Sequence, residues 1–269
     1  MLWIMVLLGM IVGVFGAMMG VGGGILLIPI LTGIFDIPIK TSVAASIICV
    51  VATSCGASVS YLQKELTHIR LAMTLETATV AGALAGGITA VWMDARWLTI
   101  IFGCVLIYAF YSMQKFKGSD GDSRPTGLLD AEYIDPVTKE TVAYGVRNLW
   151  AGLGLSFIAG NISGLLGVGG GIVKTPVMNL MMGVPLRAAI ATSNFMIGIT
   201  AATGALVYFA HGLIDPALAA PITLGVLAGS RMGARLGSRI KSRRLKQMFQ
   251  ALLLVFAVQM FIQAFRGRS

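Results

Sequence analysis

A gapless internal repeat constrains the fold of this chain more than any other feature of its sequence. The run Gly-Val-Gly-Gly-Gly-Ile at residues 20–25 returns at residues 167–172, an offset of 147. The same offset applies along both halves of the chain, so each half is one copy of a single structural unit. Other residues that match at this offset are Leu2 with Leu149, Trp3 with Trp150, Pro38 with Pro185, Tyr61 with Tyr208 and Phe102 with Phe249.

Apolar segments fill most of each half. The chain is 57% hydrophobic and 12% charged, whereas a soluble domain has roughly 25% charged residues. Each half has two short apolar segments around its glycine run and three that approach the roughly 20 residues needed to span a bilayer. We therefore predict an all-α polytopic membrane protein, each repeat being a broken or re-entrant helix pair followed by three transmembrane helices. The predicted segments are 2–18, 25–34, 42–62, 71–93 and 97–114, then 149–165, 172–182, 189–210, 217–238 and 246–265.

The loop charges predict that the two repeats have inverted topologies. The loop before the last segment of the second half is the most basic of the chain, so we place it in the cytoplasm. The matching loop of the first half, residues 92–99, contains only Asp94 and Arg96 and is placed outside. An odd number of spans in each half, here three, produces this inversion. If the broken pair at the start of each half instead crossed the membrane once, each half would have four spans and the repeats would be parallel. The basic residues of the cytoplasmic loop are Arg239, Lys241, Arg243, Arg244 and Lys246.

Polar composition divides the chain into three parts. Residues 1–117 form the first transmembrane repeat, and residues 148–269 form the second. Residues 118–147 are the one long polar stretch and are predicted to be a cytoplasmic connector, in which residues 133–138 form a small hairpin because Asp-Pro favours a turn. We attribute the net charge of +9 to membrane topology and expect no nucleic acid as a partner, because no basic helix with interleaved aromatic residues lies outside the apolar segments.

The two glycine runs are the sharpest candidates for a substrate site. Each glycine costs a helix about 1 kcal/mol relative to alanine, so a run of them should unwind it. Unwound backbone at membrane depth is tolerated where it is shielded or lines a polar cavity, and broken helices in inverted-repeat transporters direct their N-termini at anions. A tight turn or close helix packing explains the same glycines without a ligand. The residues whose amides are predicted to bind a small anion are Gly22, Gly23, Gly24, Gly169, Gly170 and Gly171.

Charged and polar residues inside the apolar segments are further candidates. Lys174 follows Gly171 by three positions, where the first repeat has Leu27. A lysine at the bilayer centre costs roughly 2.5–3.5 kcal/mol, so it either faces an anion or extends to the membrane surface. Glu76 is the only acidic residue within a predicted span, and it is either a proton-coupling group or an interfacial residue. The neutral residues predicted to line the site are Ser46, Asn161, Ser193 and Asn194.

The most specific stretches of sequence surround the second glycine run. They are Gly160-Asn-Ile-Ser-Gly-Leu-Leu-Gly-Val-Gly-Gly-Gly171, Pro176, Gly183-Val184-Pro185, Ala191-Thr192-Ser193 and Thr200-Ala201. In these residues, and over essentially the whole chain, the sequence resembles the TauE/SafE family of sulfite exporter-like membrane transporters. The resemblance implies transport of sulfite, organosulfonates or related sulfur compounds. The first repeat departs from the pattern, with Ala44-Ala45-Ser46 at the position of Ala191-Thr192-Ser193, which leaves symmetric use of both repeats open.

We therefore predict a secondary transporter, an exporter of a small sulfur-containing anion such as sulfite or an organosulfonate, that works by alternating access. The alternatives are an anion channel and a sulfur-compound uptake protein that uses Cys49 or Cys55. The chain is expected to be a multi-pass protein of the cell (inner) membrane and not an enzyme. It is expected to need no cofactor and no metal, since His68 and His211 are far apart and the three cysteines lack CxxC spacing. Its expected partners are the lipid bilayer and a small anion, and a homo-oligomer is compatible with the sequence.

Overall fold

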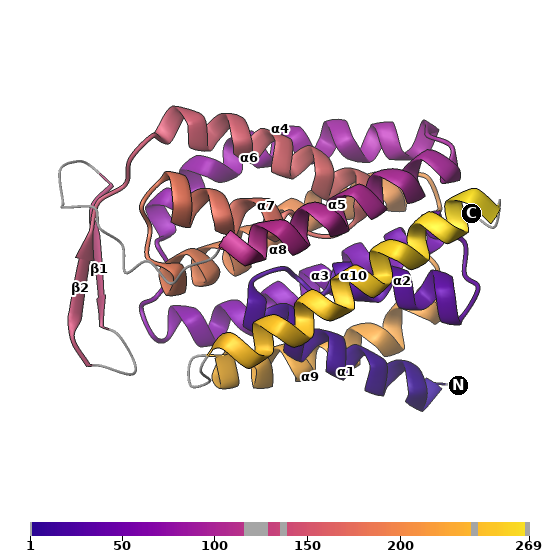
Figure 1. Cartoon of the computed structure of the whole chain (residues 1–269), viewed down its shortest axis with the longest axis horizontal. Coiled ribbons are helices and arrows are strands. Elements are labelled where there is room, and N and C mark those ends of the chain that lie inside the picture. The colour runs from indigo at the N-terminus through magenta and orange to yellow at the C-terminus, as the bar shows by residue number, and fades with distance from the viewer. Residues whose placement is uncertain (1, 116–128, 135–138, 238–241, 267–269) are drawn as a thin grey trace.

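The computed structural model describes residues 2–115, 129–134, 139–237 and 242–266, and this part of the chain is mostly helical (Figure 1). The predicted all-α polytopic fold is confirmed. A small antiparallel hairpin of β1 (Ala131–Ile134) and β2 (Thr141–Tyr144) separates the two halves. The helices of the first half are α1 (Leu2–Met19), α2 (Gly24–Ile34), α3 (Ile39–Leu62), α4 (Ile69–Trp92) and α5 (Ala95–Lys115). The second half contains α6 (Leu149–Leu166), α7 (Gly171–Pro176), the π-helical turn η1 (Val177–Met181), α8 (Leu186–Ala210), α9 (Pro216–Gly237) and α10 (Ser242–Arg266).

Seven of the described helices are long and apolar enough to cross a membrane. They include α1 and α6, with 18 residues each. The sequence predicted these first segments to be too short to span, and that expectation about their length was wrong. An α-helix of this size is about 27 Å long, because each residue rises 1.5 Å, which is close to the thickness of the hydrocarbon core.

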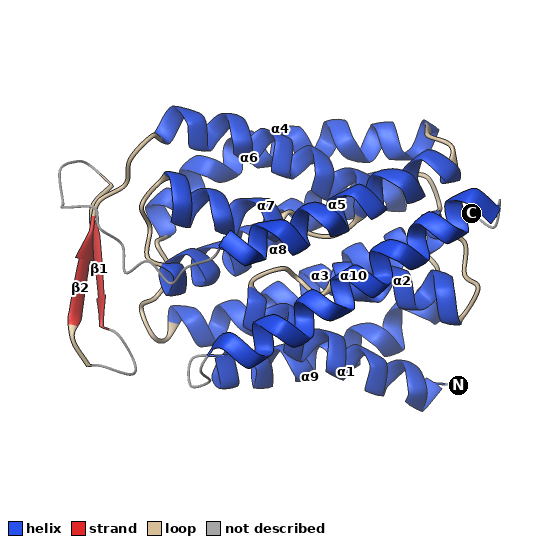
Figure 2. Ribbon diagram, in the orientation of Figure 1, coloured by secondary structure: helices blue, strands red, loops and turns tan. Residues whose placement is uncertain are grey.

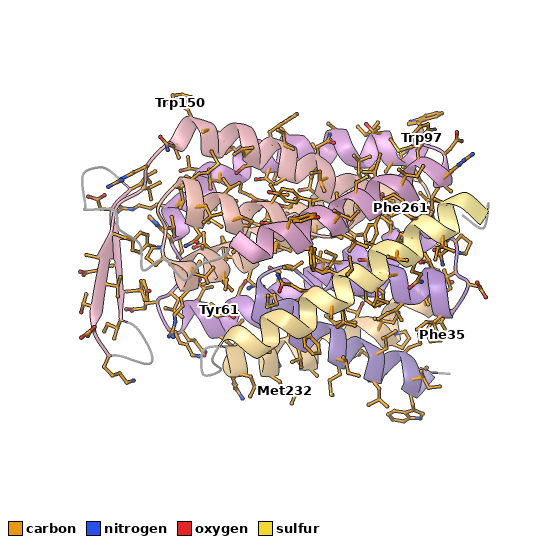
Figure 3. The ribbon with its side chains drawn as sticks, viewed as in Figure 1. Phe35, Tyr61, Trp97, Trp150, Met232 and Phe261 are labelled. Carbon is orange, nitrogen blue, oxygen red and sulfur yellow. The ribbon has the colours of Figure 1, made fainter. Side chains whose placement is uncertain are left out.

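The elements α6, α7 and η1 form a hairpin in which the start of α6 lies beside the end of η1. The amide of Arg147, just before α6, donates to the carbonyl oxygen of Met182, just after η1, over 3.0 Å. The side-chain amide of Asn148 donates to the carbonyl oxygen of Met181 over 3.2 Å. Figure 3 places Trp150, at the start of α6, and Phe35, which follows α2, toward opposite ends of the bundle. The two broken helix pairs therefore open at opposite ends.

Helices from opposite halves pack through seams of small residues. A Cβ atom on Gly229 of α9 would clash with the carbonyl oxygen of Met10 on α1. At the repeat-equivalent position, Gly82 of α4 lies in the same way against Phe157 of α6. Small residues let membrane helices approach closely, so the glycines of α9 and α4 form packing seams between the two halves. Further pairs in these seams are Gly225 with Val6, Gly233 with Val14 and Gly86 with Asn161.

The repeat-equivalent helices α3 and α8 pack against each other in the middle of the bundle (Figure 2). Of the seven candidate spans, α3 is the most deeply buried. On either side, α9 covers α3 and α4 covers α8, so each central helix is also covered by a second helix of the other half. The two glycine breaks lie against this central pair.

The β1–β2 hairpin lies at the end of the bundle opposite the two termini (Figure 1). Tyr144 is buried, and its ring meets the ring of His68 edge-on at a centroid distance of 5.8 Å. His68 precedes α4, and its backbone amide donates to the hydroxyl of Thr192 on α8 over 3.0 Å. Burial, with the positive charge of Arg70 as a second cause, lowers the pKa of His68. The hairpin is thus linked to two membrane helices through one neutral histidine.

Two sequence predictions fall outside the described residues. The predicted Asp-Pro turn is at residues 135–138, although the strands on both sides of it do pair as a hairpin. The basic loop on which the predicted topology depends includes Arg239 and Lys241, and both belong to residues 238–241, outside the described residues.

We predict that the hairpin detaches more readily at acidic pH. Because the pKa of His68 is lowered in the folded state, the unfolded state binds this proton more readily, and stability is lost as pH falls through about 6.5, the ordinary histidine value. Hydrogen exchange of residues 141–144, corrected for the intrinsic effect of pH, should be faster at about pH 5 than at about pH 8. The His68→Gln variant should lose this difference, and a difference that persists in the variant would contradict the assignment.

Candidate functional site

The two glycine breaks have the same backbone conformation. Gly20, Gly22 and Gly23 have positive φ angles of 69°, 81° and 76°, and their repeat mates Gly167, Gly169 and Gly170 have φ angles of 64°, 78° and 70°. Only glycine adopts this left-handed region without a steric cost, so each run ends one helix and starts the next. Helix α2 begins directly after Gly23, and α7 begins directly after Gly170.

The two breaks are in direct contact with each other. A Cβ atom on Gly24 would lie 2.5 Å from the carbonyl oxygen of Gly167, and one on Gly171 would clash with the carbonyl oxygen of Gly20. All of these residues are buried. The two breaks therefore meet at one buried place between the halves, and the contact explains why side chains are absent there. Val50 of α3 and its repeat mate Ile197 of α8 each approach both Gly22 and Gly169.

Ser46 and Ser193 connect the breaks across the two halves. The hydroxyl of Ser46, on α3, donates to the carbonyl oxygen of Gly167 over 2.9 Å. The hydroxyl of Ser193, on α8, donates to the carbonyl oxygen of Gly20 over 3.1 Å. The two serines are repeat mates and so are the two carbonyls, so one hydrogen bond is the counterpart of the other. Each serine holds the break of the opposite half.

The amides predicted to bind an anion are left out of the hydrogen bonds that close the turns. At the first break, the amides of Leu26 and Leu27 donate to Gly23. At the second, those of Val173 and Lys174 donate to Gly170. In the described loops and turns, no backbone carbonyl accepts a bond from the amides of Gly22–Gly24 or Gly169–Gly171. The first amides of a helix have no partner within it, so these groups are available donors.

Lys174 forms a buried polar cluster with Glu76 of α4 and Thr200 of α8. The Nζ atom of Lys174 lies 3.3 Å from Oε2 of Glu76 and donates to Oγ1 of Thr200 over 2.6 Å. The Thr200 hydroxyl donates to Oε1 of Glu76. Lys174 is 1% exposed and Glu76 is 4% exposed. Both side chains are therefore buried inside the helix bundle, and Lys174 does not extend to the protein surface.

The equivalent place in the other half of the bundle is uncharged. The repeat mates of Lys174, Glu76 and Thr200 are Leu27, Thr223 and Thr53. Thr223 lies 3.6 Å from the sulfur of Cys49, and the Thr53 hydroxyl donates to the carbonyl oxygen of Cys49 over 2.9 Å. The backbone is thus duplicated, whereas the charge occurs at one of the two places.

Asn194 lies at the breaks, but Asn161 does not. The side-chain amide of Asn194 donates to the carbonyl oxygens of Ala17 and Ile190, and its buried Oδ1 atom has no protein partner. Asn161 is half-buried on α6, with its backbone packed against Gly86 of α4. The structure therefore brings the glycines, Ser46, Ser193, Asn194 and Lys174 together, with Glu76 beside Lys174, and leaves Asn161 in a helix seam.

Two residues that sequence reasoning did not rank belong to this region. Thr200 bridges Lys174 and Glu76, but a threonine that recurs as Thr53 in the other repeat gave no sign of a special partner. The hydroxyl of Ser163 is buried without a protein partner, and its Cβ atom lies 3.4 Å from the position of a Cβ atom on Gly170. Its repeat mate is Gly16. This difference between the two repeats is the sequence feature that could have pointed to Ser163.

The cysteines do not form a site of their own. Cys49 is buried one helical turn from Thr53, whereas Cys55 and Cys104 are exposed, and none of the three forms a disulfide. Within the described ranges, no group of three histidine, cysteine, aspartate or glutamate side chains is placed to hold a metal ion. A pocket of about 230 Å³ lies beside His68 and the β1–β2 hairpin, away from the glycine breaks.

Comparison with known families identifies this arrangement. The family model described as sulfite exporter TauE/SafE matches residues 5–260, which include both glycine breaks and the Lys174 cluster. The chain belongs to the TauE/SafE family. The resemblance drawn from the second glycine run is confirmed by this match.

Curated proteins similar to this TauE/SafE chain are named as transporters. The chain is 24% identical over 237 residues to the probable membrane transporter protein YunE of Bacillus subtilis, which covers 85% of this chain and 86% of that protein. It is 28% identical over 211 residues to the probable membrane transporter protein MJ0441 of Methanocaldococcus jannaschii, covering 76% and 71%. It is 24% identical over 229 residues to the probable membrane transporter protein YdhB of Bacillus subtilis, covering 84% and 85%. No solved structure matches the chain.

These findings confirm three predictions about the TauE/SafE chain. It is a multi-pass membrane protein, and its family and relatives are membrane transporters, not enzymes. The seven candidate spans agree with this class.

We predict that removing one member of the buried ion pair destabilises the protein more than removing both. In Lys174→Leu, the Glu76 carboxylate loses its buried counter-charge, which costs about 3–5 kcal/mol. Adding Glu76→Thr gives the residues of the uncharged counterpart, Leu27 and Thr223, and should restore most of the loss. Thermal unfolding of the three proteins in detergent measures the effect. A double variant no more stable than Lys174→Leu would show that the pair does not act as a unit.

Proposed function

We propose that this protein is a secondary transporter of a small sulfur-containing anion, with its substrate site at the paired glycine breaks. The observation that carries the proposal is the backbone contact between the breaks, at a buried place where the two halves of the bundle meet. The family description, sulfite exporter, supports sulfite or an organosulfonate as the substrate class. Export is the direction that this description favours.

In this proposal the two halves are inverted repeats that work by alternating access. The broken helix pairs open at opposite ends of the bundle, and equivalent seams join α1 to α9 and α6 to α4. Rocking one half against the other would loosen the Ser46–Gly167 contact on one side and the Ser193–Gly20 contact on the other. Because these hydrogen bonds are counterparts, the two end states are of similar energy, as alternating access requires.

The anion is held by donors that the breaks provide. When the breaks part, the amides of Gly22–Gly24 and Gly169–Gly171 and the hydroxyls of Ser46 and Ser193 face the space between them. Lys174, one helical turn after Gly170, supplies the positive charge. Asn194 adds a side-chain amide, whereas Asn161 contributes less, because its backbone packs in the seam against Gly86 of α4. Helix N-termini and successive backbone amides favour anions.

Substituting a glycine at the contact should reduce transport. A Cβ atom on Gly24 would lie 2.5 Å from Gly167 and 2.6 Å from the hydroxyl of Ser46, so Gly24→Ala keeps the breaks apart. We expect uptake of radiolabelled sulfite into proteoliposomes to fall on the order of tenfold or more, since misplacing a binding geometry by ~1 Å has effects of that size or larger. Gly154 of α6 is the matched control, because nothing lies within 4 Å of a Cβ atom placed there.

The outcomes separate this proposal from its alternatives. Normal sulfite flux in a well-folded Gly24→Ala protein would show that the glycine breaks are not part of the transport path. Flux that does not saturate and is not stimulated by substrate on the opposite side would indicate an anion channel. Flux that disappears in Cys49→Ala or Cys55→Ala, with the fold retained, would indicate that a cysteine carries the sulfur compound.

A further inference from the structure

The Lys174–Glu76–Thr200 cluster is a neutral site made of two opposite charges. The ammonium and the carboxylate are 3.3 Å apart, and both are almost fully buried within the helices that cross the membrane. Charged groups inside the membrane are expensive unless they are paired. At the counterpart position, Leu27, Thr223 and Thr53 fit in the same backbone without any charge. The fold does not need this ion pair, so its presence calls for a functional explanation.

The cluster is close to the glycine breaks. Lys174 is bonded through its backbone amide to Gly170, which ends the second break. Thr200 follows Ile197 by one helical turn, and the Ile197 side chain lies against the positions of Gly169 and Gly171. An anion that enters between the parted breaks therefore comes within reach of the flexible lysine side chain.

We propose that Glu76 and Lys174 couple the transport of one singly charged oxyanion to one proton, which rests on the proposed function. A proton from water binds to a carboxylate oxygen of Glu76, and the ionic contact with Lys174 breaks. The ammonium of Lys174 stays protonated and pairs with the anion. On release, the anion leaves, Glu76 returns its proton to water on that side, and the Lys174–Glu76 contact forms again.

Charge balance is the reason for this coupling. The empty site contains Lys174 with a positive charge and Glu76 with a negative charge, and its net charge is zero. The site loaded with a proton and a singly charged anion again has a net charge of zero. A site that holds the proton alone, or the anion alone, has a net charge buried in the membrane. Since unpaired buried charge is strongly unfavourable, only the empty and the fully loaded forms change orientation readily.

Thr200 is a positioning residue in this scheme. Its hydroxyl oxygen accepts a hydrogen bond from Lys174 while its proton is directed at Glu76. This arrangement holds the Lys174 ammonium and the Glu76 carboxylate next to each other. It also leaves each of them a polar partner when their direct contact breaks. A neutral glutamic acid can in turn donate to the Thr200 oxygen, so the hydroxyl serves both forms of the site.

In the part of the chain that the structure describes, the surroundings of Glu76 provide no second charge that competes for its proton. Helix α6, packed along α4, contains no titratable residue. Helix α8 has its titratable residues toward its two ends, and α4 has its other charged residue in the first turn. Among the described residues on these elements and α7, Lys174 is the charged group in contact with Glu76. The remaining titratable residues of α4 and α8 and the residue after α8 are Arg70, Arg187, Tyr208 and His211.

The requirement for a neutral loaded site also determines which substrate charge the site accepts. A singly charged sulfonate or hydrogen sulfite neutralises the protonated site, whereas doubly charged sulfate leaves a buried negative charge. Methanesulfonate is the better probe, because it has one negative charge at every working pH. We expect it to be preferred over sulfate at equal concentration, by on the order of tenfold or more.

The test uses the full-length protein in proteoliposomes with radiolabelled methanesulfonate. A pH gradient should drive its accumulation, and a potassium–valinomycin potential should have little effect, because the loaded and empty forms are both neutral. In Glu76→Gln, the empty site has a net positive charge and reorients poorly. Uptake driven by the pH gradient should fall at least about tenfold, while methanesulfonate exchange stays above that of protein-free vesicles. Glu132→Gln, an exposed acid of β1, should leave the pH-driven uptake intact.

Each outcome decides between the two proposals. Saturable uptake that does not depend on the pH gradient would overturn the coupling but not the transport function. Uptake that the pH gradient still drives in Glu76→Gln would have the same meaning. The absence of saturable flux for both methanesulfonate and sulfite overturns the transport function and the coupling with it. If the Glu76→Gln variant is unstable, the wild-type protein still tests the coupling. Calorimetry of methanesulfonate binding in two buffers of different ionisation enthalpy measures the number of protons taken up per anion. About one proton taken up per anion is expected from the charge balance, and none would overturn the coupling.

Discussion

The close contact of two broken helices is the constraint on which the rest of this structure depends. The carbonyl oxygen of Gly20 lies where a side chain of Gly171 would be, and Gly167 is related in the same way to Gly24. Such an approach needs glycine in both runs, since any Cβ atom would separate them. It also exposes backbone polar groups at membrane depth, which are stable only when they are bonded or shielded. Ser46 and Ser193 bond two of these carbonyls, and the central helices α3 and α8 shield the rest.

The seams between the halves follow from the same requirement. If the breaks are to meet, α1 and α6 must each pack along a helix of the other repeat, α9 and α4 respectively. Gly229 of α9 and Gly82 of α4 make this possible by letting the helix backbones touch. Each hairpin is therefore packed on the opposite half, and neither repeat buries its polar break without its partner. The gapless offset in the sequence reflects this mutual dependence, because an insertion in one copy would misplace a contact made by the other.

The sequence was sufficient for the helices, the breaks and the family, and insufficient for the side-chain partners. Hydrophobic length and glycine content are local properties, so α3, α4, α8 and α9 could be predicted to within a few residues. The pairing of Lys174 with Glu76 joins positions 98 apart on helices of different repeats, and no local pattern indicates it. Taken alone, each residue was compatible with a functional role or with a location near the membrane surface, because an unpaired charge avoids the membrane interior. Only the fold shows that each is the partner that lets the other be buried.

Duplication of the backbone and asymmetry of the charge have different physical origins. In the proposed transport cycle, two equivalent breaks give the two end states of the rocking motion similar energy, and this requirement acts on glycine and serine in both repeats. In the proposed coupling, a buried charge pair acts through its net charge alone, so one pair suffices for one anion. A second lysine at Leu27 would need a second acid at Thr223, and the site would then hold two ion pairs. Each added pair adds a desolvation cost, so a neutral counterpart is the more stable arrangement wherever one charge is enough.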